Sequence, residues 1–192
     1  QYHNAENPQS YGSVAELLVE CLGEIHCLVG TVGSGGSVCG TSDFLRQLFP
    51  DLYVIGVDTP ASVLFGLPDG KRALRGLGNS LHPQNVRHNV FDEVHWVTAA
   101  EAFWETRALH RAHAMFRGPT SGAAHLVAEW WSRNHPGKTT VVFFPDPGDR
   151  YLSTVYDDAW LQAGGFHHQR PDAPAEAQNL SHVPSDRWSR YS

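Results

Sequence analysis

The feature that most constrains the fold is a glycine-rich turn between a predicted strand and a predicted helix. Residues 25–29 are a short apolar run typical of a buried strand, and residues 38–48 have the apolar spacing of a helix. The turn contains Gly33, Ser34, Gly35, Gly36 and Ser37. Glycine lets successive backbone N–H groups point inward, and the positive end of the helix dipole favours an anion there. The turn is therefore either a phosphate-binding loop or a plain strand-to-helix connection.

Common glycine motifs do not account for this turn. A P-loop needs a following Gly-Lys-Ser/Thr, which is missing here. In a dinucleotide-binding fingerprint the third glycine would stand at position 38, where the sequence has Val38. The Gly-x-Ser-x-Gly elbow of a Ser–His–Asp hydrolase is also missing. A phosphate bound here would belong to another class of ligand.

Strands and helices alternate along the chain. Further apolar runs at 53–57, 93–97 and 139–144 predict strands, and periodic segments at 13–22, 99–115 and 121–133 predict helices. For the first helix we expect a capping box of Ser13 and Glu16 and an end at Gly23. The pattern predicts an α/β fold of three layers, with a mostly parallel sheet flanked by helices. Ligands of such sheets bind beyond the carboxyl ends of the strands.

Composition excludes some classes of function. The formal charge is −6 and no run of about 18 apolar residues occurs, so we expect neither a nucleic-acid nor a membrane partner. The three cysteines form no Cys-x-x-Cys pair, which is typical of a reducing compartment and predicts a cytoplasmic protein. The sequence begins at Gln1 and its single methionine is Met115, so we expect an upstream segment to have been removed.

Two regions follow little regular pattern. Residues 59–91 carry many turn signals with interspersed apolar residues, which indicates a long ordered loop. Residues 161–192 are polar and rich in Gly and Pro, and we predict that they form a mobile tail, with Trp188 as a possible surface anchor. The expected division is an α/β domain over 1–160 and a tail over 161–192.

Four motifs in order carry a family resemblance. They are Gly33-Ser34-Gly35-Gly36-Ser37, Arg75-Gly76-Leu77-Gly78, Gly118-Pro119-Thr120-Ser121-Gly122-Ala123, and the run from Pro145 to Thr154. Together they resemble the cysteine synthase and cystathionine β-synthase family, which are pyridoxal-phosphate enzymes with the tryptophan-synthase-β-like fold. The resemblance covers residues 1 to about 160 and implies that this chain is the larger, C-terminal part of such an enzyme.

The resemblance implies roles for particular residues. The glycine loop, Gly33 to Ser37, would bind the phosphate of pyridoxal 5′-phosphate through backbone N–H groups. Thr120 would place a hydroxyl against the pyridine nitrogen, because the family has a serine there. Gln1, in a stretch similar to the family's Gln-Phe-x-Asn-Pro-Ala-Asn, would contact the carboxylate of an amino-acid substrate, and Gly76 would line the substrate entrance. Ala5 departs from the family's proline.

The resemblance also implies what this chain does not supply. The family's Schiff-base lysine lies in an amino-terminal half, and neither Lys71 nor Lys138 stands in a lysine motif of the family. We therefore assign no catalytic residue here and expect a missing N-terminal segment or a second chain to carry the lysine. The family also implies a homodimer. The reaction implied is β-replacement, in which an activated serine loses its β-substituent to give an aminoacrylate that takes up a nucleophile.

The sequence leaves alternatives to a cysteine synthase open. Residues 62–66, 70–72 and 76–80 look more like the branch that joins an amino-acid nucleophile to an activated serine on the way to 2,3-diaminopropionate than like cysteine synthases. A non-catalytic interaction or regulatory subunit derived from this fold would need neither the phosphate motif nor the ring-nitrogen motif. Among the twelve histidines, His110 and His113 share a helix face and His26 lies near Cys27, but no Cys/His pairs recur at zinc spacing, so we predict no metal site.

Overall fold

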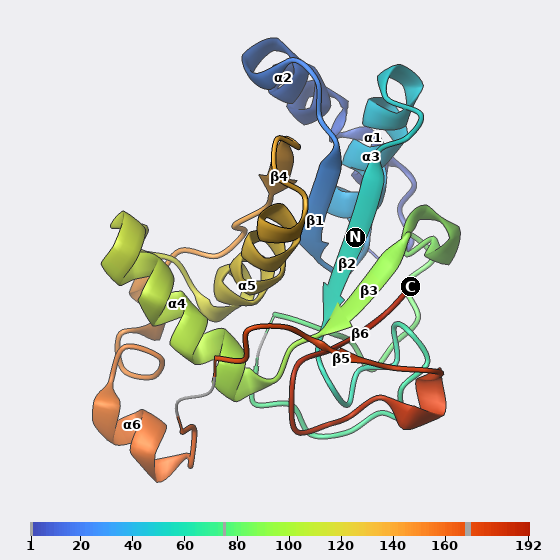
Figure 1. Ribbon diagram of the computed structural model, residues 1–192. Helices are drawn as coiled ribbons and strands as arrows, with labels where there is room; N and C mark the ends of the chain where they lie inside the picture. The colour runs from blue at the N-terminus through green and yellow to red at the C-terminus, as the bar shows by residue number, and fades with distance from the viewer. Residues whose placement is uncertain (1, 75, 168–169) are drawn as a thin grey trace.

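A computed structural model describes residues 2–74, 76–167 and 170–192. Its centre is a sheet in the order β4-β1-β2-β3-β6-β5, with helices on both faces (Figure 1). The strands are β1 (Cys27–Thr31), β2 (Tyr53–Asp58), β3 (Glu93–Trp96), β4 (Thr140–Val142), β5 (Ala175–Glu176) and β6 (Ser189–Tyr191). The first four are parallel, β6 is antiparallel to β3, and β5 is parallel to β6. The predicted three-layer α/β fold is confirmed.

The helices form two layers around this sheet. In Figure 1, α4 and α5 lie on one side of the sheet and α2 and α3 on the other. The helices are α1 (Glu6–Gln9), α2 (Gly12–Leu22), α3 (Gly36–Leu48), α4 (Ala99–His113), α5 (Pro119–Asn134) and α6 (Asp158–Ala163). Short 3₁₀ turns occur at His88–Val90, Asp149–Tyr151 and Leu180–His182. Among the described residues, no helix has the length and apolar character needed to cross a bilayer.

Strand β1 shows why the sheet strands are continuously apolar. Cys27 and Val29 pack into the core beneath α4 and α5, while Leu28 packs into the core beneath α2 and α3. Alternate side chains point to opposite faces of a strand, so a sheet covered on both faces requires apolar residues at every position. The two helical layers therefore explain the apolar run without polar alternation.

Helix ends differ from the prediction in one respect. The predicted capping box of Ser13 is wrong, because α2 begins at Gly12 and its N-cap, Tyr11, forms no side-chain cap. Ser13 consequently lies inside the first turn. The predicted end is confirmed, since Gly23 follows the helix with a φ of 70°. A capping box that was not predicted starts α4, where the side chain of Thr98 accepts from the backbone of Glu101.

The long segment 59–91 is ordered around three fully buried leucines, Leu64, Leu74 and Leu77. Ser62 supports it, because its hydroxyl accepts a hydrogen bond from the backbone N–H of Asn79 at 3.0 Å. The segment thus packs onto the carboxyl end of the sheet as an ordered loop, in agreement with the prediction.

The C-terminal segment differs from the predicted mobile tail. Strand β6 pairs with β3, and β5 pairs with β6, so this segment extends the sheet by two strands. Trp188 is 1% exposed and belongs to the core beneath α4 and α5. Its backbone N–H donates to the buried carboxylate of Glu101 at 2.7 Å. Trp188 is therefore a core residue and not a surface anchor.

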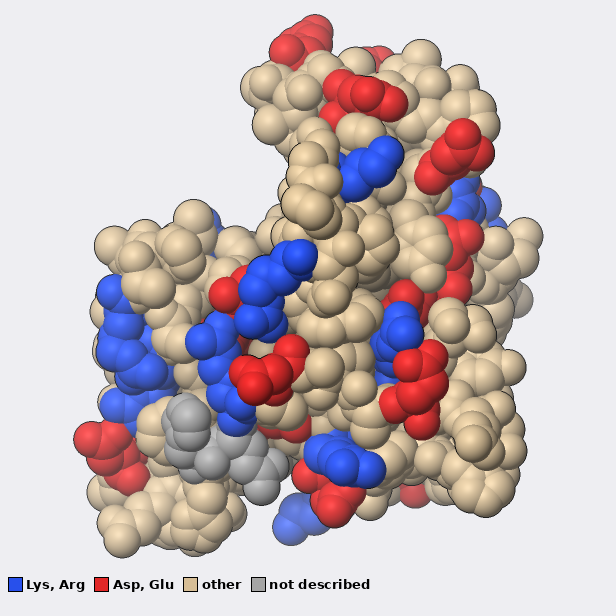
Figure 2. All heavy atoms as spheres, in the orientation of Figure 1, with Lys and Arg blue, Asp and Glu red and all other residues tan. Residues whose placement is uncertain are grey.

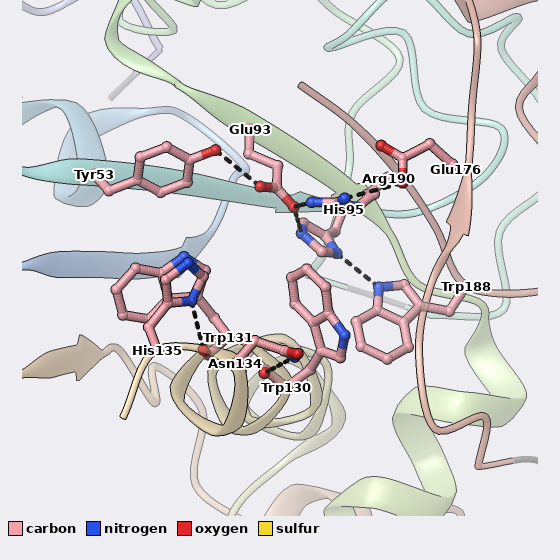
Figure 3. Close-up of polar contacts among 10 residues, drawn as sticks. All are labelled: Tyr53, Glu93, His95, Trp130, Trp131, Asn134, His135, Glu176, Trp188 and Arg190. Carbon is pink, nitrogen blue, oxygen red and sulfur yellow. Dashed lines mark hydrogen bonds and ion pairs between the residues drawn. The ribbon is translucent and has the colours of Figure 1, made fainter. Parts of the chain in front are cut away.

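A buried polar network holds the C-terminal segment at the amino ends of β2 and β3 (Figure 3). Glu93 accepts hydrogen bonds from the Tyr53 hydroxyl at 2.9 Å, from His95 Nε2 at 2.6 Å and from Arg190 at 3.1 Å. The indole N–H of Trp188 donates to His95 Nδ1 at 2.8 Å. His95 is therefore neutral with its proton on Nε2, and burial lowers its pKa. We call these five residues the Glu93 network.

The face of the molecule shown in Figure 2 has no large patch of one charge sign. Figure 2 shows Lys and Arg side chains interspersed with Asp and Glu over this face. Several of these charges form ion pairs across elements, including Arg46 with Asp92 and Arg107 with Asp158. Such intermixed charge attracts neither polyanions nor polycations strongly.

Candidate functional site

A cavity of about 460 Å³ lies at the carboxyl ends of β1 and β4. Six of the residues predicted to bind cofactor or substrate line it: Gly33, Ser34, Gly35, Ser37, Gly76 and Thr120. The other lining residues are Tyr11, Thr31, Phe143, Phe144 and Pro145. Gly36 is the buried first residue of α3, directly beside this wall. Of the remaining predictions, Gln1 lies outside the described residues, as does Arg75 of the second motif.

The glycine turn has a conformation that a larger residue would not adopt. Gly35 is the N-cap of α3 with a φ of 84°, in the left-handed region. A Cβ atom there would lie 2.5 Å from the carbonyl oxygen of Asn85. A Cβ atom on Gly36 would collide with the side-chain amide of Asn7. The close approach of the Asn85 backbone to Gly35 and of the Asn7 side chain to Gly36 explains why glycine stands at both positions.

The turn leaves hydrogen-bond donors free at the cavity. Among the described residues, the backbone N–H groups of Ser34, Gly35 and Ser37 have no acceptor. The N–H of Gly36 has only a long contact, 3.4 Å, to the Ser34 hydroxyl. Unpaired N–H groups at a helix N-terminus form an anion site, because they carry the positive end of the helix dipole. The donor set fits a phosphate group.

A second helix also begins at the cavity. The carboxylate of Asp146 accepts the backbone N–H groups of Thr120 at 3.0 Å and Ser121 at 2.9 Å, and it also accepts the Ser121 hydroxyl at 2.5 Å. Asp146 thus caps α5 from a distant loop and fixes Thr120 at the wall of the cavity. The sequence places Asp146 in the fourth family motif, but nothing in that motif shows that its carboxylate caps this helix.

Thr120 and Gly76 lie close together in this wall. A Cβ atom on Gly76 would lie 3.3 Å from the Thr120 hydroxyl oxygen, and Gly76 has a φ of 87°. Thr120 is 4% exposed, and its hydroxyl forms no hydrogen bond with any of the described residues. This leaves a hydroxyl available to a ligand in the cavity, opposite the glycine turn.

Asp58, at the carboxyl end of β2, is a buried acid that sequence reasoning did not single out. It is 0% exposed, and the groups that favour its charged form are the Thr59 backbone, the Ser62 hydroxyl and the more distant Arg72. Burial raises its pKa to about 7. It lies beside Gly78, where a Cβ atom would be 3.0 Å from its Oδ1. Asp58 therefore lies against the loop that carries Gly76 and Gly78.

Comparison with known proteins assigns the family. The model of the family described as "Pyridoxal-phosphate dependent enzyme" matches residues 1–146. This match covers most of the chain, including the glycine turn and the Thr120 motif. The chain belongs to the pyridoxal-phosphate dependent enzyme family, and the predicted resemblance is confirmed.

Relatives of known name refine this assignment. The N-(2-amino-2-carboxyethyl)-L-glutamate synthase of Cupriavidus metallidurans is 35% identical over 191 residues, which cover 96% of this chain and 56% of that protein. The probable cysteine synthase of Bacillus subtilis is 33% identical over 167 residues, which cover 83% of this chain and 53% of that protein. The chain spans about half the length of the curated relatives it matches.

Solved structures agree with the fold. The O-acetylserine dependent cystathionine β-synthase of Helicobacter pylori superposes with a TM-score of 0.75 at 31% identity, over 80% of this chain and 51% of that one. The O-acetyl serine sulfhydrylase isoform 3 of Entamoeba histolytica has a TM-score of 0.75 at 30% identity, over 81% of this chain and 48% of that one. The arrangement of helices around the sheet is thus that of the cysteine synthase type.

Proposed function

We propose that this chain is the C-terminal, cofactor-phosphate-binding part of a pyridoxal-phosphate enzyme that replaces the β-substituent of an activated serine. O-acetylserine and O-phosphoserine are the substrates we propose to test. The observation that carries the proposal is the set of unpaired N–H groups of Ser34, Gly35 and Ser37 at the N-terminus of α3. This set faces the same cavity as Thr120.

The glycine turn supplies the binding energy for the phosphate. Its N–H groups are held in place by the close contacts of Gly35 and Gly36 with the neighbouring chain, so they need no reordering when an anion binds. Preorganised donors of this kind bind a phosphate without a charged side chain. The Ser34 and Ser37 hydroxyls add donors that can rotate toward the same anion.

Thr120 sets the polarity at the opposite wall. Its hydroxyl is neutral, so it can hydrogen-bond a pyridine nitrogen without holding that nitrogen protonated, as a carboxylate would. Asp146 orients Thr120 by fixing the first turn of α5. When bound, pyridoxal phosphate supplies the electron sink for elimination at the substrate's β-carbon. Gly76 keeps the space between Thr120 and the cavity open, because it has no side chain.

The two lysines of this chain lie away from the cavity. Neither lysine lines the cavity: Lys71 is exposed in the long loop, and Lys138 is exposed just before the amino end of β4, at the other end of the strands. The lysine that holds the cofactor covalently in this family therefore comes, in our proposal, from an N-terminal segment or a second chain. A homodimer of the complete enzyme is part of the same proposal.

The proposal has two testable forms, which differ in the nucleophile that adds to the substrate. The name of the Cupriavidus relative points to L-glutamate as the group that is joined, and the name of the Bacillus relative points to sulfide chemistry. We propose an amino-acid nucleophile, on the precursor branch of 2,3-diaminopropionate, because the relative from Cupriavidus aligns with 96% of this chain. A non-catalytic subunit is the competing function.

The test is reconstitution. The chain is mixed or co-expressed with the lysine-bearing amino-terminal half of the Cupriavidus relative and given pyridoxal phosphate. O-acetylserine or O-phosphoserine is then offered with either sulfide or L-glutamate, and products are identified by mass spectrometry. We expect a glutamate adduct that depends on both halves. A stable complex that traps no cofactor with borohydride and forms no product would exclude the enzyme and favour the non-catalytic subunit.

A further inference from the structure

A cluster of metal-ligating side chains lies between α4 and α5, apart from the cofactor cavity. It comprises Glu105 from α4 and His125 and Glu129 from α5. One ligand atom from each residue lies within 4.8 Å of the others. His125 and Glu129 are four residues apart on one helix, a spacing that places both side chains on the same face. Glu105 comes from α4, which packs beside α5 (Figure 1).

The strongest indication that the cluster binds a ligand comes from the buried carboxylate of Glu105. Its side chain is 1% exposed, and among the described residues its Oε2 accepts no hydrogen bond of acceptable geometry. Its Oε1 lies 2.6 Å from His125 Nδ1. A buried carboxylate oxygen without a hydrogen bond is costly unless a cation compensates it. In this structure the compensating cation is the guanidinium of Arg170, whose Nε lies 3.0 Å from Oε2.

The positive charge of Arg170 compensates only part of the negative charge of the cluster. Arg170 also pairs with Glu129, so one guanidinium faces two carboxylates. Its own side chain is 43% exposed, in contrast to Glu105, so it can turn out into solvent without breaking the core. A divalent cation in its place would match both carboxylate charges and take His125 Nδ1 as a neutral ligand.

We propose that Glu105, His125 and Glu129 form a binding site for a divalent first-row transition cation, and that Arg170 occupies the site when the metal is absent. One imidazole and two carboxylates suit Zn²⁺, whose bonds to such ligands are about 2.0–2.2 Å. Three protein ligands leave the fourth position of Zn²⁺ to water. The metal would crosslink α4 to α5, five residues after Thr120.

The site adjoins the cofactor cavity through one side chain. The ring of His125 lies 6.1 Å from the ring of Phe144, between centroids, and Phe144 lines the cavity. His113, which the sequence singled out together with His110, packs its ring 5.7 Å from that of His125. His110 contacts Phe116 and Tyr156 instead, so it lies outside the cluster.

The experiment measures binding of Zn²⁺ alone to the chelator-stripped chain by titration calorimetry and metal analysis. The variants are H125A, R170A and, as a matched control, H110A, in which an exposed histidine of α4 outside the cluster is removed. We expect one Zn²⁺ per chain, affinity lowered at least about 100-fold in H125A and unchanged in H110A. R170A should bind about tenfold more tightly, because the competing cation is gone.

A second readout separates metal coordination from a folding defect. Co²⁺ bound in place of Zn²⁺ should give a visible absorption spectrum in wild type, R170A and H110A, and none in H125A, with circular dichroism showing all four folded. If R170A binds no metal, or H125A binds as tightly as wild type, the cluster is an ion-pair network only and the proposal is wrong. Because this test needs no cofactor, its failure leaves the proposed function untouched.

Discussion

The two ends of the central sheet use buried polar groups in opposite ways. At the amino ends of β2 and β3, the carboxylate of Glu93 accepts hydrogen bonds from three side chains, and His95 is bonded through both ring nitrogens. At the carboxyl ends, the N–H groups of Ser34, Gly35 and Ser37 and the Thr120 hydroxyl have no partner among the described residues. A saturated network stabilises a fold, whereas preorganised unpaired donors are available to a ligand.

Two buried carboxylates show the same contrast in their ionisation. Burial opposes ionisation of Glu93, but hydrogen bonds from His95, Arg190 and Tyr53 outweigh it and lower its pKa to about 2. At Asp58 burial outweighs the hydrogen bonds from the Thr59 backbone and the Ser62 hydroxyl, and it raises the pKa to about 7. The amino end therefore holds a charge that belongs to the folded structure, and the carboxyl end holds a carboxyl whose charge costs stability.

The largest effect should come from breaking the Glu93 network. Glu93→Ala removes the carboxylate that the buried His95 and the partly buried Arg190 share, and we expect it to lower the free energy of unfolding by about 3–5 kcal/mol. Urea denaturation measures this. Glu176→Ala removes the exposed partner of the same arginine and should cost less than about 1 kcal/mol. Equal losses in the two variants would show that the network has no special role.

The glycine turn should be next in sensitivity. Gly35→Ala would place a Cβ 2.5 Å from Asn85 O at a φ of 84°, and we expect binding of pyridoxine 5′-phosphate to weaken about 100-fold, or about 2.7 kcal/mol. Equilibrium dialysis measures the affinity. Gly137→Ala is the matched control, because Gly137 has a φ of 82° with no atom within 4 Å of its Cβ position. Similar losses in both variants would mean that general backbone strain, and not the turn, controls binding.

The raised pKa of Asp58 predicts that its contribution to the free energy of unfolding changes with pH in the opposite direction to that of Glu93. The folded pKa of Asp58, about 7, lies above the ordinary 3.8, so the folded state binds more protons than the unfolded state between these values. Stability should therefore fall as pH rises from 4 to 7, by at most about 1.4 kcal/mol per pH unit. Subtracting the unfolding free energies of Asp58→Asn from those of the wild type isolates this dependence. If this difference in unfolding free energy does not change with pH, the pKa of Asp58 is not raised in the folded state.

Removal of the Thr120 hydroxyl should have the smallest effect of these substitutions. Thr120→Val removes one neutral hydrogen bond to a ring nitrogen, and we expect about fivefold weaker binding of pyridoxine 5′-phosphate, or about 1 kcal/mol. Thr120→Ser should restore wild-type affinity, since it keeps the hydroxyl. Weakening in both variants would assign the effect to packing instead.

The sequence predicts the main α/β elements because their signals are local. Strands β1 and β2 are apolar on both faces, and the glycine turn follows β1 directly. The missed features depend on contacts between distant residues. Strand β6 has three residues, and its register with β3, Trp96 opposite Ser189, is set by residues 93 positions away. Asp146 stands in the fourth family motif, but its role as the cap of a helix that begins 27 residues earlier depends on a contact that the motif does not show.

The most direct test of the account compares pyridoxine 5′-phosphate with pyridoxine as ligands of the wild-type chain. Neither has an aldehyde, so neither can form a Schiff base with Lys71 or Lys138, and the difference between them is the phosphate. If the donors of Ser34, Gly35 and Ser37 bind phosphate, the phosphorylated ligand should bind at least about 100-fold more tightly. Equal affinity for the two ligands would contradict the assignment of the glycine turn as the phosphate site.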